Sequence, residues 1–95
     1  MSTLLTDEQV SEALAGLDGW TRDGGAIVRA AELASFPAAI EAVRRIAEIA
    51  EARDHHPDMD IRWRTVTFRC STHSAGGITD KDVQLAREIN TVLAS

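Results

Sequence analysis

The three histidines are the side chains of this chain best suited to proton transfer, and all of them lie between residues 51 and 82. His55 and His56 are adjacent and are followed by Pro57, whereas His73 comes later. An unperturbed imidazole titrates at about pH 6.5, so it can donate or accept a proton near neutrality. The placement of all the histidines in one such segment indicates that they are used for proton transfer, metal binding or pH sensing.

One carboxylate and the expected secondary structure indicate how these imidazoles are arranged. Glu51 is four residues before His55, so the two share a helical face if the helix continues that far. A carboxylate on that face would fix which ring nitrogen carries the proton. His56 then points elsewhere, and His73 ends a predicted strand that can pair beside residues 55–57. We therefore expect the imidazoles to converge in one pocket that holds both an acid and a base.

Two other interpretations of the histidines stay open at this point. Adjacent histidines chelate a metal poorly and the chain has no His-x-x-x-His pair, which argues against a metal site. The histidines are also consistent with ordinary surface or capping residues held by local hydrogen bonds. Asp82 likewise has an adequate structural role in the first turn of its helix, and Glu51 is consistent with a solvated helix charge.

Capping residues and hydrophobic periodicity predict the elements that position these side chains. Thr6 and Gln9 have the spacing of a capping box, and Thr79 precedes acidic residues that favour a helix N-terminus. Gly24–Gly25 marks a hairpin turn, and Pro57 ends the helical region before it. The predicted elements are a helix from Thr6 to about Gly16, strands over 20–23 and 26–33, a helix from Ser35 to about Arg53, strands over 60–62 and 64–72, and a helix from Thr79.

This arrangement predicts a single α+β domain over residues 1–95, with the order α-β-β-α-β-β-α. Three helices pack on one face of a four-stranded antiparallel sheet. In the last strand, apolar side chains alternate with polar ones, which is typical of a strand with one buried face. The predicted apolar faces are Phe36, Ile40, Val43, Ala47 and Ala50 of the central helix, widened by Ile46 and Ile49, and Val66, Phe68 and Cys70 of the last strand.

Composition and charge limit the function classes. The chain has 95 residues, 44% hydrophobic and 26% charged, which is ordinary for one small globular domain. Its formal net charge of -5 argues against binding to a nucleic-acid backbone, which needs clustered Lys and Arg. The single cysteine, Cys70, excludes an internal disulfide and is expected to be a packed strand residue. We see no secretory signal and no run long enough to span a membrane, so a cytoplasmic location is expected.

Self-association is also expected from the size of the chain. A core this small is only marginally stable, and a four-stranded sheet leaves edge strands whose backbone groups need partners. A homodimer or a homotetramer is therefore the expected state.

Residues of the histidine segment and its surroundings resemble the signature of the pterin-4a-carbinolamine dehydratase family. That signature has an acid ahead of a His-His-Pro run, an aromatic residue further on, a Thr-His pair and an Asp in the last helix. The resemblance covers nearly the whole chain, including the early Gly19–Trp20 pair. The matching residues are Glu51, His55, His56, Pro57, Trp63, Ser71, Thr72, His73, Gly77, Ile78, Thr79 and Asp82.

The resemblance implies a hydro-lyase that dehydrates a 4a-hydroxytetrahydropterin to the quinonoid dihydropterin, in support of tetrahydrobiopterin recycling. It implies no metal and no cofactor. It further implies that His55 and His73 are the acid–base pair, and that His56 helps to hold and polarise the pterin. The residues that it implies in substrate binding are Asp54, His55, His56, Ser71, Thr72, His73 and Ser74.

The resemblance also assigns supporting roles around the histidines. Glu51 would orient a histidine, and Pro57 would fix the turn that separates the two adjacent imidazoles. Trp63 and Asp82 belong to the signature and are expected to support the site.

One segment departs from the family pattern. Members of animal origin usually have an aromatic residue shortly after the proline, where this chain has Asp58–Met59–Asp60. A flexible methionine can cover the pocket, so the departure bears on the preferred pterin side chain and not on the reaction. The alternative function is that of a non-catalytic binding module. Some members of the family look like dimerisation partners of a homeodomain transcription factor, and some related domains look like assembly factors. The three retained histidines favour catalysis over that alternative.

Overall fold

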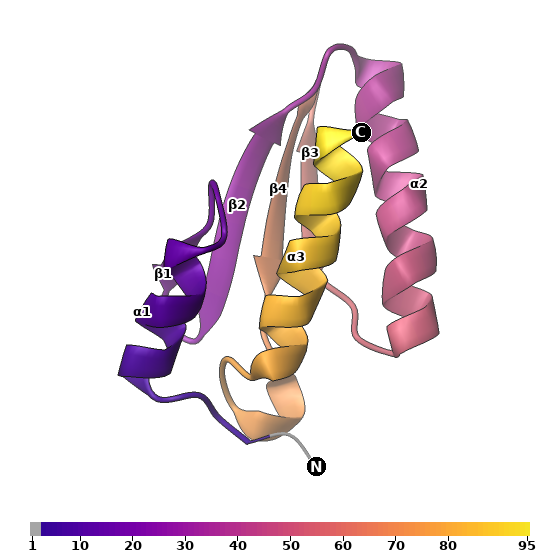
Figure 1. The fold of residues 1–95 in the computed structure, drawn as a ribbon. Helices are drawn as coiled ribbons and strands as arrows, with labels where there is room; N and C mark the ends of the chain where they lie inside the picture. The colour runs from indigo at the N-terminus through magenta and orange to yellow at the C-terminus, as the bar shows by residue number, and fades with distance from the viewer. Residues whose placement is uncertain (1–2) are drawn as a thin grey trace.

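The computed structural model describes residues 3–95, so residues 1–2 of the predicted domain lie outside the described part. Within that part the elements follow the predicted order, which confirms the α+β class. They are α1 (Asp7–Ala15), β1 (Thr21–Asp23), β2 (Ala26–Glu32), α2 (Phe36–Arg53), β3 (Asp58–Arg62), β4 (Thr65–Cys70), the 3₁₀ turn η1 (His73–Ala75) and α3 (Asp80–Ala94). Figure 1 shows the helices gathered on one face of the sheet, with α3 between α1 and α2.

The strands form one antiparallel sheet in the order β1-β2-β4-β3. β4 lies inside this sheet and alternates as predicted. Val66, Phe68 and Cys70 are fully buried in the core that the sheet shares with the helices, and the residues between them are only partly buried on the opposite face. One face of the sheet is therefore core, and the other is open.

Capping boxes set the start of the first and last helices. At α1, the Gln9 N–H donates to Thr6 Oγ1 at 3.1 Å, and the Thr6 N–H donates to Gln9 Oε1 at 2.8 Å. Thr79 and Asp82 form the second box, at the start of α3. Such boxes satisfy backbone N–H groups that the first helical turn leaves unpaired. The second box brings the Asp82 carboxylate to the N-terminal end of α3, which faces the histidine segment.

The buried face of α2 is rotated from the predicted one. Phe36 and Ile40 are 48% and 42% exposed, and Ala47 is also exposed, so the prediction was wrong for these three residues. Alanine side chains allow α2 to approach its neighbours closely, and this packing is favoured over burial of the larger side chains. The residues of α2 that are buried are Ala39, Ala42, Ile46 and Ala50.

None of the helices within residues 3–95 has both the length and the apolar character needed to cross a lipid bilayer.

Candidate active site

The strand register places the two histidine segments at the same end of the sheet. Asp58, the first residue of β3, is paired with Arg69 near the end of β4. Because the strands are antiparallel, residues 55–57 approach this pair from the same end at which residues 71–73 leave it. This agrees with the expectation that the strand before His73 pairs beside the first histidine segment.

His55 is held by a buried carboxylate from α3. Its Nε2 lies 2.6 Å from Oδ1 of Asp82, and the two side chains are 11% and 0% exposed. An ionised carboxylate only accepts hydrogen bonds, so Nε2 carries the hydrogen in this pair. Nδ1 is then the nitrogen of His55 that can exchange a proton with a bound molecule.

The second oxygen of Asp82 ties this pair to the rest of the fold. Asp82 Oδ2 accepts the hydroxyl of Thr72 at 2.8 Å and the backbone N–H of Thr79 at 2.9 Å. The hydroxyl oxygens of Thr72 and Thr79 are also 2.8 Å apart, and both residues are buried. Since Thr72 immediately precedes His73, one buried network joins His55 to the segment that carries His73. Sequence reasoning treated Thr79 as a helix cap and as a match to the family signature, and its spacing to Asp82 was the one local signal of this network.

Glu51 is paired with His56 and not with His55, which corrects the sequence-based expectation. The helix ends at Arg53, and Asp54 adopts a left-handed conformation with φ 51° and ψ 42°. The chain therefore leaves the helical register before His55. His56 Nε2 lies 2.7 Å from Glu51 Oε1, with side chains 56% and 81% exposed, so this pair is far more open to solvent than the His55 pair. Glu51 thus contacts a histidine other than the one that the helical spacing predicted, and its role in orienting a histidine stays a prediction.

The other predicted substrate contacts differ in their accessibility. His73 and Ser74 begin the η1 turn and are exposed, and Asp54 is exposed at the end of α2. The Ser71 hydroxyl donates to the carbonyl of Gly25 at 2.8 Å, which ties this segment to the β1–β2 turn. Thr72 is buried and its hydroxyl is already bound to Asp82. Its backbone N–H donates to the Gly77 carbonyl at 2.8 Å, and its carbonyl accepts the Gly76 N–H at 3.0 Å. The polar groups of Thr72 are thus engaged within the protein, and the substrate contact expected for this residue stays a prediction.

Trp63 lies away from the histidines within one chain. It follows β3 at the end opposite Pro57, and the six-residue step from one to the other corresponds to about 20 Å of extended chain. The Trp63 side chain is 71% exposed, and the Arg64 guanidinium lies 4.7 Å from its ring centroid. Pro57, by contrast, is buried beside His56. The supporting role expected for Trp63 stays a prediction.

Comparison with known proteins identifies the family. Residues 3–92 match the family described as pterin 4 alpha carbinolamine dehydratase. The chain belongs to this dehydratase family. A relative from Mycolicibacterium vanbaalenii, provisionally named a pterin-4-alpha-carbinolamine dehydratase, is 62% identical over 90 residues, which are 95% of this chain and 97% of that protein. A relative of the same name from Mycobacterium avium is 59% identical over 97% of this chain and 98% of its own.

A solved structure supports the same family. The crystal structure of a transcriptional coactivator/pterin dehydratase from Brucella melitensis has a TM-score of 0.91 to this chain and 34% sequence identity. The match covers 94% of this chain and 97% of that one.

This member of the dehydratase family also has a buried thiol beside the histidine network. Cys70 is 0% exposed, and burial raises its pKa to about 12, with smaller contributions from the negative charges of Asp82 and Asp58. The thiol therefore stays protonated at neutral pH and is a poor nucleophile. The charges of Asp58 and Asp82 thus both act on the Cys70 thiol.

The raised pKa of Cys70 should make the protein less stable in alkaline solution. Below pH 9.0, the ordinary value for this thiol, the folded and unfolded states both hold the proton, and stability is unaffected. As the pH rises from there towards about 12, mainly the unfolded state loses its proton. The free energy of unfolding then falls by about 1.4 kcal/mol per pH unit, or about 2–3 kcal/mol by pH 11. Urea unfolding at several pH values between 8 and 11 measures this slope.

The control for this slope is Cys70→Ala, which is expected to be less stable at every pH but to lack the alkaline decline. Few other groups titrate in this range, because the chain has no Tyr and Lys81 is its only lysine. An equally steep decline in Cys70→Ala would contradict the assignment.

The donor geometry does not favour a metal site. Among residues 3–95, no three His, Cys, Asp or Glu side chains are arranged to hold a metal ion. His55 and His56 each engage a different carboxylate through Nε2, so the adjacent imidazoles are oriented towards separate partners. This arrangement suits two imidazoles with distinct roles.

Proposed function

We propose that this protein is a hydro-lyase that converts a 4a-hydroxytetrahydropterin to the quinonoid dihydropterin and water. The observation that carries the proposal is the His55–Asp82 pair, in which a buried carboxylate orients an imidazole at the end of the sheet where His73 also lies. The family match and the names of the relatives support the same substrate class. In a cell, this reaction would serve tetrahydrobiopterin recycling for aromatic amino acid hydroxylases.

Loss of water from this substrate needs two proton transfers. The 4a-hydroxyl must gain a proton to leave as water, and a ring nitrogen must lose one as the imine forms. We assign these transfers to His55 and His73, one as the acid and the other as the base. Asp82 holds His55 in one tautomer and stabilises the positive charge of the ring whenever it carries a second proton. His56, which is exposed and paired with Glu51, is assigned to holding the pterin.

A dehydration assay tests the proposal directly. The substrate is generated chemically as a 4a-hydroxytetrahydropterin, and its loss of water is followed with and without the protein. We expect a rate that increases in proportion to protein concentration and that survives exhaustive chelation. A rate equal to spontaneous water loss, with the protein folded by circular dichroism, would refute the proposal.

A binding role is the second candidate function. The similarity to the Brucella melitensis protein favours it, because that protein is described as a transcriptional coactivator as well as a pterin dehydratase. Failure of the dehydration assay in a folded protein would favour this role, because the fold would then be retained without its chemistry.

We propose that the exposed apolar surface of α2, formed by Phe36 and Ile40, joins copies of this chain into a homodimer or homotetramer. The edge strand β3 is less suited, because Asp58, Asp60 and Arg62 place charges along it. Light scattering should therefore give two or four times the monomer mass of 10.3 kDa. Ile40→Glu should shift the protein towards monomer, whereas Leu4→Glu, at an exposed position outside α2, should not. Monomer mass for the unmodified protein at all working concentrations would contradict this proposal.

A further inference from the structure

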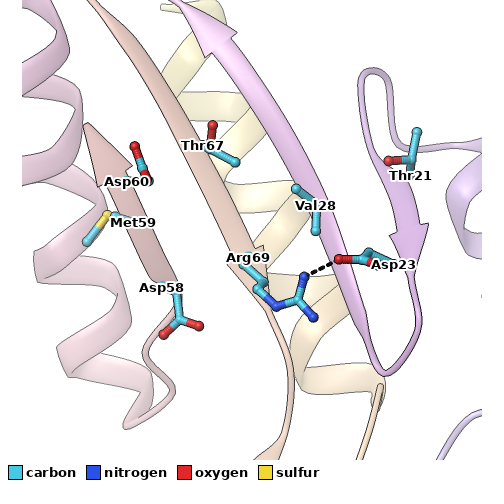
Figure 2. Close-up of a pocket in the computed structure, with 8 residues that line it drawn as sticks. All are labelled: Thr21, Asp23, Val28, Asp58, Met59, Asp60, Thr67 and Arg69. Atoms are coloured by element: carbon cyan, nitrogen blue, oxygen red, sulfur yellow. Dashed lines mark hydrogen bonds and ion pairs between the residues drawn. The ribbon is translucent and has the colours of Figure 1, made fainter. Parts of the chain in front are cut away.

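The open face of the sheet, opposite the helices, carries a cavity of about 340 Å³. This volume falls in the range of small-molecule sites, roughly 300–1,000 Å³. Figure 2 shows that side chains from neighbouring strands surround it, with the helices behind the sheet. The lining residues that matter here are Asp23, Val28, Asp58, Asp60, Thr67 and Arg69.

Most charges in this cavity are already paired. Arg69 Nη1 lies 2.6 Å from Asp23 Oδ2, the pair drawn in Figure 2. Asp60 Oδ1 lies 3.1 Å from Nε of the exposed Arg62. Within residues 3–95, no ion pair or side-chain hydrogen bond engages the carboxylate of Asp58. Asp58 is therefore the carboxylate of this cavity that has both oxygens available to accept hydrogen bonds from a ligand.

Asp58 also lies at the end of the cavity nearest the histidines. It is two residues after His56, so their Cα atoms are at most about 7 Å apart. Asp58 is paired in the sheet with Arg69, the residue before Cys70, and the negative charges of Asp58 and of the His55 partner Asp82 both contribute to the raised pKa of the Cys70 thiol. A pterin held at the histidines therefore has this cavity within reach of a substituent on its ring.

We propose that Asp58 determines substrate specificity by accepting hydrogen bonds from a hydroxyl-bearing substituent of the pterin and by repelling an anionic one. This inference rests on the proposed function and names the side-chain class of its substrate. Thr67 adds a hydroxyl and Val28 a short apolar surface, which suit a short polyol chain. A carboxylate or phosphate on the substituent would face the unpaired charge of Asp58 at close range. Such like-charge contacts lower affinity by about tenfold at low salt.

The test compares two pterins of similar size, 6-hydroxymethylpterin and 6-carboxypterin, by fluorescence titration. We expect the full-length protein to bind the hydroxymethyl compound about tenfold more tightly at low ionic strength, with the preference shrinking at high salt. Asp58→Asn should reduce this preference to about one. Asp60→Asn is the matched control, since it removes the same charge from the same cavity at a residue already paired with Arg62, and it should keep the preference.

The outcomes separate this inference from the proposed function. Dehydratase activity with equal affinity for both pterins would overturn the role of Asp58 and leave the proposed function intact. An undiminished preference in Asp58→Asn, or an equal loss of preference in Asp60→Asn, would also overturn the assignment to Asp58. If the protein neither binds nor dehydrates any pterin, the proposed function fails and this inference fails with it.

Discussion

His55→Gln and His73→Ala should each lower kcat for pterin dehydration by about 10²–10⁴-fold. That range is typical when one partner of general acid–base catalysis is removed. His55→Gln is preferred to alanine because its amide N–H can still donate to Asp82, which would otherwise lose a hydrogen bond in a buried position. His73 is exposed, so its replacement by alanine should leave the fold unaffected. The measurement is kcat from initial rates, after subtraction of spontaneous water loss.

His56→Ala serves as the comparison, because His56 lies in the same segment but is paired with exposed Glu51. If it only holds the pterin, its loss should mainly raise KM and change kcat much less. Circular dichroism and thermal unfolding of all three variants check that the fold is intact. Near-normal kcat in both His55→Gln and His73→Ala would end the assignment of these residues as acid and base.

The fold could be predicted from the sequence because its determinants are local. The Thr6–Gln9 capping box and the hairpin turn at Gly24–Gly25 involve residues close together in the chain, and both occur as expected. The alternation in β4 likewise fixed which side chains are buried. The burial of α2 was harder to predict, because its apolar side chains occupy two adjacent stripes. Packing against α3 and the shared core selected the stripe that contains Ala39 and Ala42, and this contact is not local.

The site was predicted less completely than the fold for the same reason. The helical pairing of Glu51 with His55 failed because Asp54 ends α2 in a left-handed conformation, and no glycine marks that position in the sequence. Aspartate tolerates this conformation more readily than most residues, but that tendency is too weak to predict a helix end. The true partner of His55 is Asp82, 27 residues away, and only the folded chain brings them together.

Asp82→Asn should lower kcat by about 10²–10⁴-fold while leaving most of the stability intact. Asparagine has the shape of aspartate and can still accept a hydrogen bond from Thr79 at the start of α3. Its NH₂ group, however, would face His55 Nε2 as a donor and favour the tautomer that carries the hydrogen on Nδ1. The imidazole would then present the wrong nitrogen to the substrate. A normal kcat and pH–rate profile for Asp82→Asn would show that Asp82 does not position His55.

Asp82→Ala should be severely destabilising, because it removes the acceptor for three donors at once. His55 and the Thr79 N–H would lose their partner in a region that is almost inaccessible to water, and the Thr72 hydroxyl would keep only the Thr79 hydroxyl. Each unsatisfied buried group costs about 1–3 kcal/mol, so we expect a loss of about 3–5 kcal/mol. A domain of this size has only about 5–14 kcal/mol of stability, and Tm should fall by at least about 15 °C. Asp80→Asn is the control, since Asp80 is an exposed acid in the same helical turn and should change Tm by only a few degrees. Similar Tm values for Asp82→Ala and the unmodified protein would mean that this network orients His55 without stabilising the fold.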